Sequence, residues 1–172
     1  MYQAGDIVAV KGSPEQIALN ALITPVTDRW HHFLITVVLD GDCEIIEETP
    51  DGVRSGRLSF YNDQDLKVWR IPDVQVAKAV AAAGSRYGRS GYDYILFADL
   101  LAQATDYWWR NGMKPVPYTQ FKETEGKQMV CTGLVKRCCL DSRWPLVPPD
   151  LAPTPSALQV GFLATGMQPI TP

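Results

Sequence analysis

The stretch Phe33-Leu34-Ile35-Thr36-Val37-Val38-Leu39 predicts the centre of the fold. It is rich in β-branched residues and almost continuously apolar, which is typical of a central, buried strand. The dipeptide Asp40-Gly41 follows as a hairpin turn signal, and residues 43–48 have the pattern of the returning strand. We therefore expect a β-hairpin with His31 and His32 at the open end of its first strand.

The register of this hairpin follows from its turn. With a two-residue loop, Leu39 pairs with Asp42, and the numbers of paired residues sum to 81. Glu47 then faces Leu34 and lies diagonally from His32 on the same face of the sheet. By the same alternation, His31 shares its face with Glu48. Both His–Glu pairs are geometrically possible, and the hairpin alone does not choose between them.

A second pattern begins at Cys131, in Met129-Val130-Cys131-Thr132-Gly133-Leu134-Val135. Apolar residues follow Cys131 with the spacing of one helical face, which predicts a helix that begins near Cys131. A helix N-terminus favours a thiolate and offers backbone N–H groups to an oxyanion. The alternative is that Cys131 is a small buried core residue, as most unpaired cysteines are.

Composition narrows the class of protein. A chain of 172 residues predicts one domain, residues 1–172, in which residues 144–172 form a proline-rich tail that wraps the surface. A net charge of −3 argues against nucleic-acid binding. We find no signal peptide and no long apolar run, so we expect a protein that is cytoplasmic or released without a classical signal peptide. Cys-x-x-Cys spacing is missing too, so we expect no metal and no cofactor.

The remaining elements complete an α+β fold. The sequence predicts strands at residues 7–10, 57–61 and 67–71, and helices at residues 15–22, 73–84 and 93–109. Asp73 is the expected N-cap of the second helix, and Gly84 its end. Residues 113–127 are expected to form a surface loop near the site. A single helical turn is expected at residues 156–160.

These elements supply the parts of a thiol active site. A thiol needs a base to become a nucleophile at neutral pH, and the base needs a third group that orients it. Cys131 is the candidate nucleophile, and one of the two His–Glu pairs would supply the base and the orienting group. Alternatively, the histidines and glutamates are solvated residues at strand ends.

Several short motifs together resemble the circularly permuted branch of NlpC-type papain-like hydrolases, to which the YiiX-like amidases belong. The resemblance covers about residues 4–162. It rests on Gly5-Asp6-Ile7-Val8, His32-Phe33-Leu34-Ile35, Ile45-Ile46-Glu47-Glu48-Thr49-Pro50-Asp51-Gly52-Val53, Val68-Trp69-Arg70, Tyr92-Asp93-Tyr94, Val130-Cys131-Thr132-Gly133-Leu134-Val135 and Pro153-Thr154-Pro155-Ser156-Ala157-Leu158. The resemblance implies a papain-like fold in which a small sheet or barrel packs against helices. It also implies Cys131 as nucleophile, His32 as base and Glu47 as the orienting residue.

The resemblance leaves the substrate open. Where the family has a small residue two positions after the histidine, this chain has Leu34, and where it often has Ser-Glu after the cysteine, this chain has Thr132-Gly133. Tyr92 and Tyr94 are candidates for lining the cleft, with a place in the core or rim as the alternative. We expect a cysteine hydrolase acting on a small peptide, a peptidoglycan fragment or a lipid-linked amide. An acyltransferase of the same fold and an inactive papain-like binding module are the alternatives.

Overall fold

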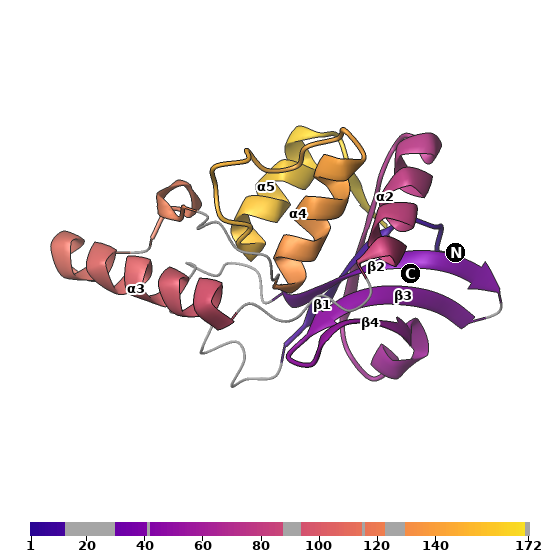
Figure 1. The fold of residues 1–172 in the computed structure, drawn as a ribbon, viewed down its shortest axis with the longest axis horizontal. Helices are drawn as coiled ribbons and strands as arrows, with labels where there is room; N and C mark the ends of the chain where they lie inside the picture. The colour runs from indigo at the N-terminus through magenta and orange to yellow at the C-terminus, as the bar shows by residue number, and fades with distance from the viewer. Residues whose placement is uncertain (13–29, 41, 88–93, 115, 123–129, 171–172) are drawn as a thin grey trace.

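A computed structural model describes residues 1–12, 30–40, 42–87, 94–114, 116–122 and 130–170. Within these ranges the chain forms an α+β fold with a six-stranded antiparallel sheet and four α-helices (Figure 1). The strands are β1 (Ile7–Lys11), β2 (Trp30–Asp40), β3 (Asp42–Thr49), β4 (Gly52–Arg57), β5 (Leu66–Arg70) and β6 (Gln168–Ile170). The helices are α2 (Val74–Arg86), α3 (Tyr94–Asn111), α4 (Cys131–Asp141) and α5 (Pro155–Ala164), with short 3-10 helices η1 (Leu58–Tyr61) and η2 (Tyr118–Gln120). The strand order in the sheet is β4-β3-β2-β1-β5-β6.

The predicted hairpin is confirmed as β2 and β3. Leu34 pairs with Glu47 and Ile35 with Ile46, so the register near the histidines is the expected one. The register shifts by one residue between Thr36 and Val38, and the pairs beyond that point sum to 82. The irregularity thus lies between the turn and the open end of the hairpin, and the expected register holds where the site was predicted.

The two faces of the sheet carry separate apolar clusters. Ile7, Phe33 and Ile35 belong to the cluster that packs against α2, α4 and α5, which lie together on one side of the sheet in Figure 1. Val8 and Leu34 belong to a smaller cluster on the other face, where η1 packs. Helix α3 extends away from both layers in the same view. None of the described helices combines the length and hydropathy that a bilayer-spanning segment requires.

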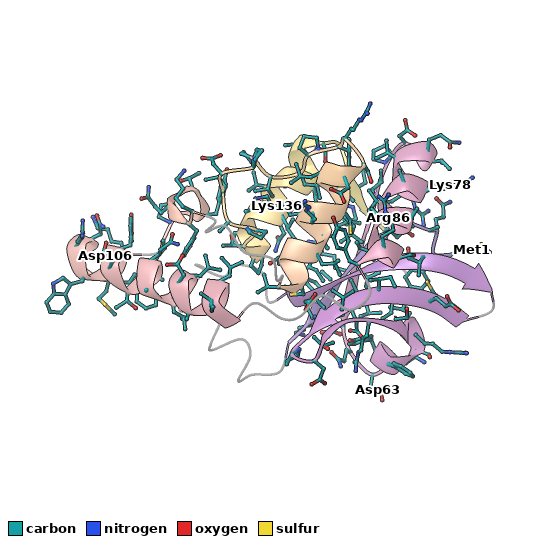
Figure 2. All side chains as sticks on the ribbon, viewed as in Figure 1. Met1, Asp63, Lys78, Arg86, Asp106 and Lys136 are labelled. Carbon is teal, nitrogen blue, oxygen red and sulfur yellow. The ribbon has the colours of Figure 1, made fainter. Side chains whose placement is uncertain are left out.

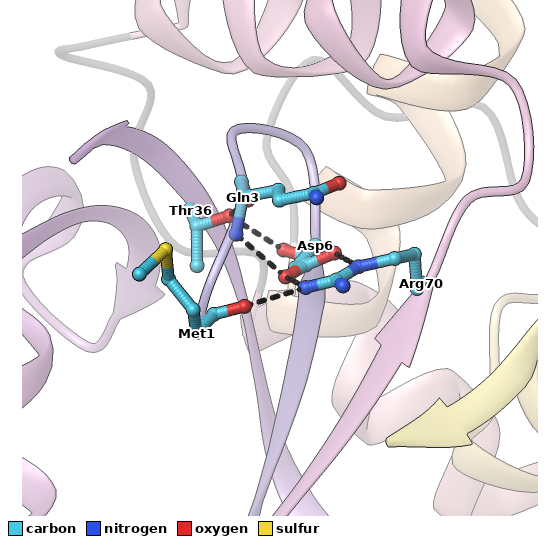
Figure 3. Close-up of polar contacts among 5 residues, drawn as sticks. All are labelled: Met1, Gln3, Asp6, Thr36 and Arg70. Carbon is cyan, nitrogen blue, oxygen red and sulfur yellow. Dashed lines mark hydrogen bonds and ion pairs between the residues drawn. The ribbon is translucent and has the colours of Figure 1, made fainter. Parts of the chain in front are cut away.

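A buried ion pair anchors the start of the chain (Figure 3). Asp6 is almost fully buried, and Arg70 donates to both of its carboxylate oxygens, at 3.0 and 2.8 Å. Arg70 also donates to the carbonyl of Met1, and the backbone N–H of Gln3 donates to Asp6. These bonds hold the first residues against β5, because a buried carboxylate needs donors around it.

The C-terminal region differs from the expected extended tail. It contains the ten-residue helix α5, which is longer than the single predicted turn, and strand β6, which extends the sheet. Thr154 caps α5 through its side chain and Pro155 occupies the first turn, a favourable combination for a helix start. Lys136 of α4, labelled in Figure 2, is buried and donates to the carbonyls of Pro149 and Leu151.

Two other expectations need correction, and two more lie partly or wholly outside the described residues. Residues 57–61 are not a strand, because Arg57 ends β4 and Leu58 begins η1; strand β4 itself was not predicted. The helix capped by Asp73 does not end at Gly84 but continues to Arg86. The expected loop at residues 113–127 contains η2, and its residues 115 and 123–129 lie outside the described residues, as does the expected helix at residues 15–22.

Gly5 generates a stability prediction. It has φ of +86°, and a Cβ atom there would lie 2.1 Å from the carbonyl oxygen of Ala77. We expect Gly5→Ala to lower the free energy of unfolding by about 3 kcal/mol or more, since backbone atoms of α2 would have to move. Gly166→Ala is the matched control, because Gly166 also has a positive φ, +76°, but open space around it. The control should lose only about 1 kcal/mol in urea unfolding; equal losses would contradict the close-approach argument.

Candidate active site

Glu47 is a fully buried carboxylate held by three side chains. Its Oε2 atom lies 2.7 Å from Nε2 of His32, and it also accepts a hydrogen bond from the hydroxyl of Tyr61. The second oxygen, Oε1, accepts a bond of 3.0 Å from Nε of Arg54. A buried charge of this kind is tolerated only when it is paired and hydrogen-bonded, and Glu47 meets that condition.

The sheet register brings these donors together. Glu47 pairs with Leu34 across β2 and β3, which places His32 one diagonal step away. Glu47 also pairs with Arg54 across β3 and β4. Tyr61 comes from the end of η1, and its ring lies 5.9 Å from the His32 ring, centroid to centroid. Each donor thus reaches Glu47 from a different element.

The contacts shift the pKa values of Glu47 and His32 in opposite directions. Burial alone would raise the pKa of Glu47, but the bonds from His32, Tyr61 and Arg54 outweigh it and lower that pKa to about 2. Burial likewise lowers the pKa of His32, but hydrogen bonds with Cys131 and Glu47, together with their charges, raise it to about 9. At neutral pH, Glu47 is therefore a carboxylate and His32 an imidazolium.

Cys131 is the first residue of α4, as the sequence predicts. The N-cap residue Val130 has no side-chain acceptor, and no acidic residue lies in the first turn. The positive end of the helix dipole therefore lies at Cys131, and neither the N-cap residue nor the first turn supplies an anion that would offset it. The side chain of Cys131 hydrogen-bonds with His32, which brings the thiol, the imidazole and the Glu47 carboxylate into one chain of contacts.

The other three cysteines are set apart by burial. No cysteine of the chain forms a disulfide, and Cys131 is half-buried whereas Cys43, Cys138 and Cys139 are buried. Burial raises the pKa of the Cys138 thiol to about 12 and raises that of Cys139 as well. Reactive cysteines are partly exposed and lie near a positive charge, a combination that Cys131 has with His32.

The structure describes the remaining candidate site residues to different extents. Glu48 is buried, and neither of its oxygens has a hydrogen-bond partner in the part of the chain that the structure describes. The side chains of His31 and Tyr94 lie outside the described residues, although their backbone belongs to β2 and α3. Tyr92 lies outside them entirely.

Sequence reasoning missed two members of the site, Arg54 and Tyr61. A signal for Arg54 was present: the turn at Pro50-Asp51 pairs Thr49 with Gly52, and counting back along β3 from that turn places Arg54 opposite Glu47. Tyr61 offered no comparable signal, because η1 was read as a strand. Among the described residues, no group of three or more histidine, cysteine or acidic side chains is placed to hold a metal ion.

The burial of Glu47 generates a pH-dependent prediction. Its folded-state pKa of about 2 lies below its usual 4.5, so the stability it contributes is complete above about pH 4.5 and is lost as the pH falls toward 2. We expect Glu47→Gln to cost roughly 2–4 kcal/mol at pH 7, because His32, Tyr61 and Arg54 lose their acceptor charge. The difference from wild type should shrink at pH 2.5.

Urea unfolding at the two pH values measures this difference. Asp63→Asn is the control, since Asp63 is an exposed carboxyl near η1, and it should change stability by less than about 0.5 kcal/mol. A Glu47→Gln penalty that is equal at pH 7 and pH 2.5 would show that the carboxylate charge does not contribute.

A comparison with protein-family models finds no match to this chain. A comparison with curated proteins finds no match either. Any assignment of function therefore rests on the residues of the site: Cys131, His32 and Glu47 with its two further donors.

Proposed function

We propose that this chain is a cysteine hydrolase that cleaves an amide bond through an acyl-enzyme on Cys131. The observation that carries the proposal is the position of His32, which contacts the buried Glu47 carboxylate through Nε2 and also hydrogen-bonds with Cys131. A thiol, an imidazole and a carboxylate in this order form the arrangement that nucleophilic catalysis by cysteine needs. His32 is the acid–base residue and Glu47 the residue that orients it.

In the proposed resting site, His32 is charged and contacts both Glu47 and Cys131. His32 carries a proton at neutral pH because its pKa is raised to about 9, which places a positive charge beside the thiol, as nucleophilic cysteines require. Because Nε2 of His32 is hydrogen-bonded to Glu47, we assign the proton that moves during the reaction to Nδ1 of the same ring. Glu47 itself keeps its charge throughout, since its pKa is about 2. Its role is to fix the ring and stabilise the imidazolium.

The chemical steps follow from these charges. The thiolate of Cys131 attacks the carbonyl carbon, and the backbone N–H at the start of α4 stabilises the oxyanion. His32 gives its Nδ1 proton to the leaving amine as the C–N bond breaks. The neutral imidazole then takes a proton from water, which attacks the thioester. Release of the acid returns Cys131 as thiolate and His32 as imidazolium.

The order of the residues along the chain supports a permuted architecture. His32 on β2 and Glu47 on β3 precede Cys131 on α4, whereas ordinary papain-like enzymes have cysteine first. We propose accordingly a circularly permuted NlpC-type papain-like fold. The proposed substrates are a small peptide, a peptidoglycan fragment or a lipid-linked amide, and the acyl acceptor is water.

Alkylation by iodoacetamide tests the ion pair. We expect Cys131 to react at pH 6.5 at least about tenfold faster than an ordinary thiol, because the proposed mechanism needs a reactive thiol beside the charged His32. His32→Ala should remove that advantage, and peptide mapping by mass spectrometry assigns the modified cysteine. Cys138 serves as an internal control and should stay unmodified in the folded protein, since it is fully buried. An unreactive or ordinary Cys131 in the wild type would count against the proposal.

Turnover of an activated ester tests the acyl-enzyme. A p-nitrophenyl ester should give a burst of about one p-nitrophenol per chain, followed by a slower steady rate. Cys131→Ala should abolish the burst, and Cys43→Ala should keep it. Adding a primary amine separates hydrolysis from acyl transfer, because a transferase would turn over faster and form the new amide. If no acyl donor forms a covalent intermediate on Cys131, the proposed catalysis is wrong and a binding role is left for the site.

A further inference from the structure

Tyr61 and His32 share one oxygen atom of the buried Glu47 carboxylate. Oε2 of Glu47 lies 2.7 Å from Nε2 of His32 and also accepts a hydrogen bond from the hydroxyl of Tyr61. The other oxygen, Oε1, accepts a bond of 3.0 Å from Nε of Arg54. Two donors on a single carboxylate oxygen divide its negative charge between them. The imidazole is therefore held by a carboxylate that a phenol and a guanidinium already neutralise in part.

Packing holds Tyr61 in this position. It is the last residue of η1 and packs against the apolar cluster that contains Val8 and Leu34. Its ring centroid lies 5.9 Å from that of His32, with 35° between the ring planes, which is within the usual range for packed aromatic rings. Burial and the hydrogen bond to Glu47 raise the pKa of the Tyr61 hydroxyl, so it stays protonated and remains a donor at neutral and mildly alkaline pH.

The titratable groups that contact His32 come from three elements. Among the described residues they are Glu47 from β3, Tyr61 from η1 and Cys131 from α4. Arg54 from β4 reaches Glu47 at the oxygen that His32 does not use. Glu48 is next along β3 and points to the opposite face of the sheet. Of these groups Glu47 favours the imidazolium, and every other donor that takes up part of its charge weakens that effect.

We propose that Tyr61 is a positioning residue of the same site that limits how strongly Glu47 holds the proton on His32. Acting through Glu47, the Tyr61 hydroxyl keeps the imidazolium a strong enough acid to give its proton to the leaving amine. This catalytic meaning rests on the proposed function, whereas the contacts among the three side chains do not depend on it. A Tyr61 that served only to hold Glu47 in place would have the opposite effect, because its loss would loosen the contact between Glu47 and His32.

The titration of His32 distinguishes the two roles by the sign of a shift. We would follow the ring resonances of ¹³C-labelled histidine by NMR from pH 6 to 11, with a His31→Asn variant to assign the two histidines. In Tyr61→Phe we expect the pKa of His32 to rise from about 9 by about half a unit or more, because Glu47 then offers Oε2 to His32 alone. A lower or unchanged pKa would overturn the inference.

Two further variants test the same argument elsewhere in the chain. Arg54→Met removes the donor to the other oxygen of Glu47 from a half-exposed position, so it too should raise the pKa of His32, and a lowered pKa would contradict the sharing of charge. Tyr87→Phe is the matched control, because the Tyr87 hydroxyl also donates to a carboxylate, that of Asp141 at the end of α4. It should leave the His32 titration unchanged, and a rise as large as that in Tyr61→Phe would overturn the inference.

The rates of acylation test the consequence for catalysis. A p-nitroanilide needs a proton from His32 when its C–N bond breaks, whereas p-nitrophenolate leaves an ester without one. The ratio of the two acylation rates therefore reports the acid strength of His32, and the thiolate fraction of Cys131 cancels from it. We expect Tyr61→Phe to lower the anilide-to-ester ratio about two- to threefold and Tyr87→Phe to leave it unchanged. An unchanged ratio in Tyr61→Phe would overturn the catalytic part of the inference.

Failure of this inference and failure of the proposed function give different results. A wild-type Cys131 that reacts like an ordinary thiol would overturn the proposed function, and the NMR titrations would still decide whether Tyr61 weakens the hold of Glu47 on His32. A reactive Cys131 together with identical His32 titrations in wild type and Tyr61→Phe would overturn the inference and leave the proposed function standing.

Discussion

The structure around the site depends on one constraint: Glu47 is ionised and has no access to solvent. Placing a carboxylate in the interior without partners would cost several kcal/mol, so the donors around it must be held in place. They come from β2, β4 and η1, and each of these elements is therefore tied to β3 by a polar contact as well as by packing. The stability of this region and the orientation of His32 have the same physical origin.

Much of this arrangement could be predicted from sequence, because the hairpin obeys local rules. The apolar run at residues 33–39 and the turn signal after it located β2 and β3, and counting from the turn placed Glu47 on the same face as His32. The choice of this pair over His31 and Glu48 came from the family resemblance. The count assumed a regular ladder, yet the ladder has an irregularity between Thr36 and Val38. The count is nevertheless right at the open end, because this irregularity offsets a one-residue difference at the turn, where Leu39 pairs with Cys43 and not with Asp42.

The errors have physical causes too. Strand β4 was missed because Val53 is its only large apolar residue, and the strand is held by its ladder with β3. Apolar and polar residues alternate at positions 57–61 as they do in a strand. In the structure Leu58 is buried and Phe60 is exposed, so this segment packs only one residue against the sheet, which suits a 3-10 turn. The prolines of the tail suggested an extended chain, although Pro155 occupies a helix position where proline is favoured. Contacts such as that of Tyr61 with Glu47 have no local pattern in the sequence.

The two adjacent carboxyls of β3 are in opposite states because their surroundings differ. Glu47 is ionised beside the positive charge of His32, and Arg54 supplies a second positive charge from the half-exposed side. Glu48 is as deeply buried but has no donor among the described residues, so burial raises its pKa to about 8, whereas the donors around Glu47 lower the pKa of that carboxyl to about 2. The donors that the sheet places around one carboxyl and not the other therefore decide which of the two carries the charge at neutral pH.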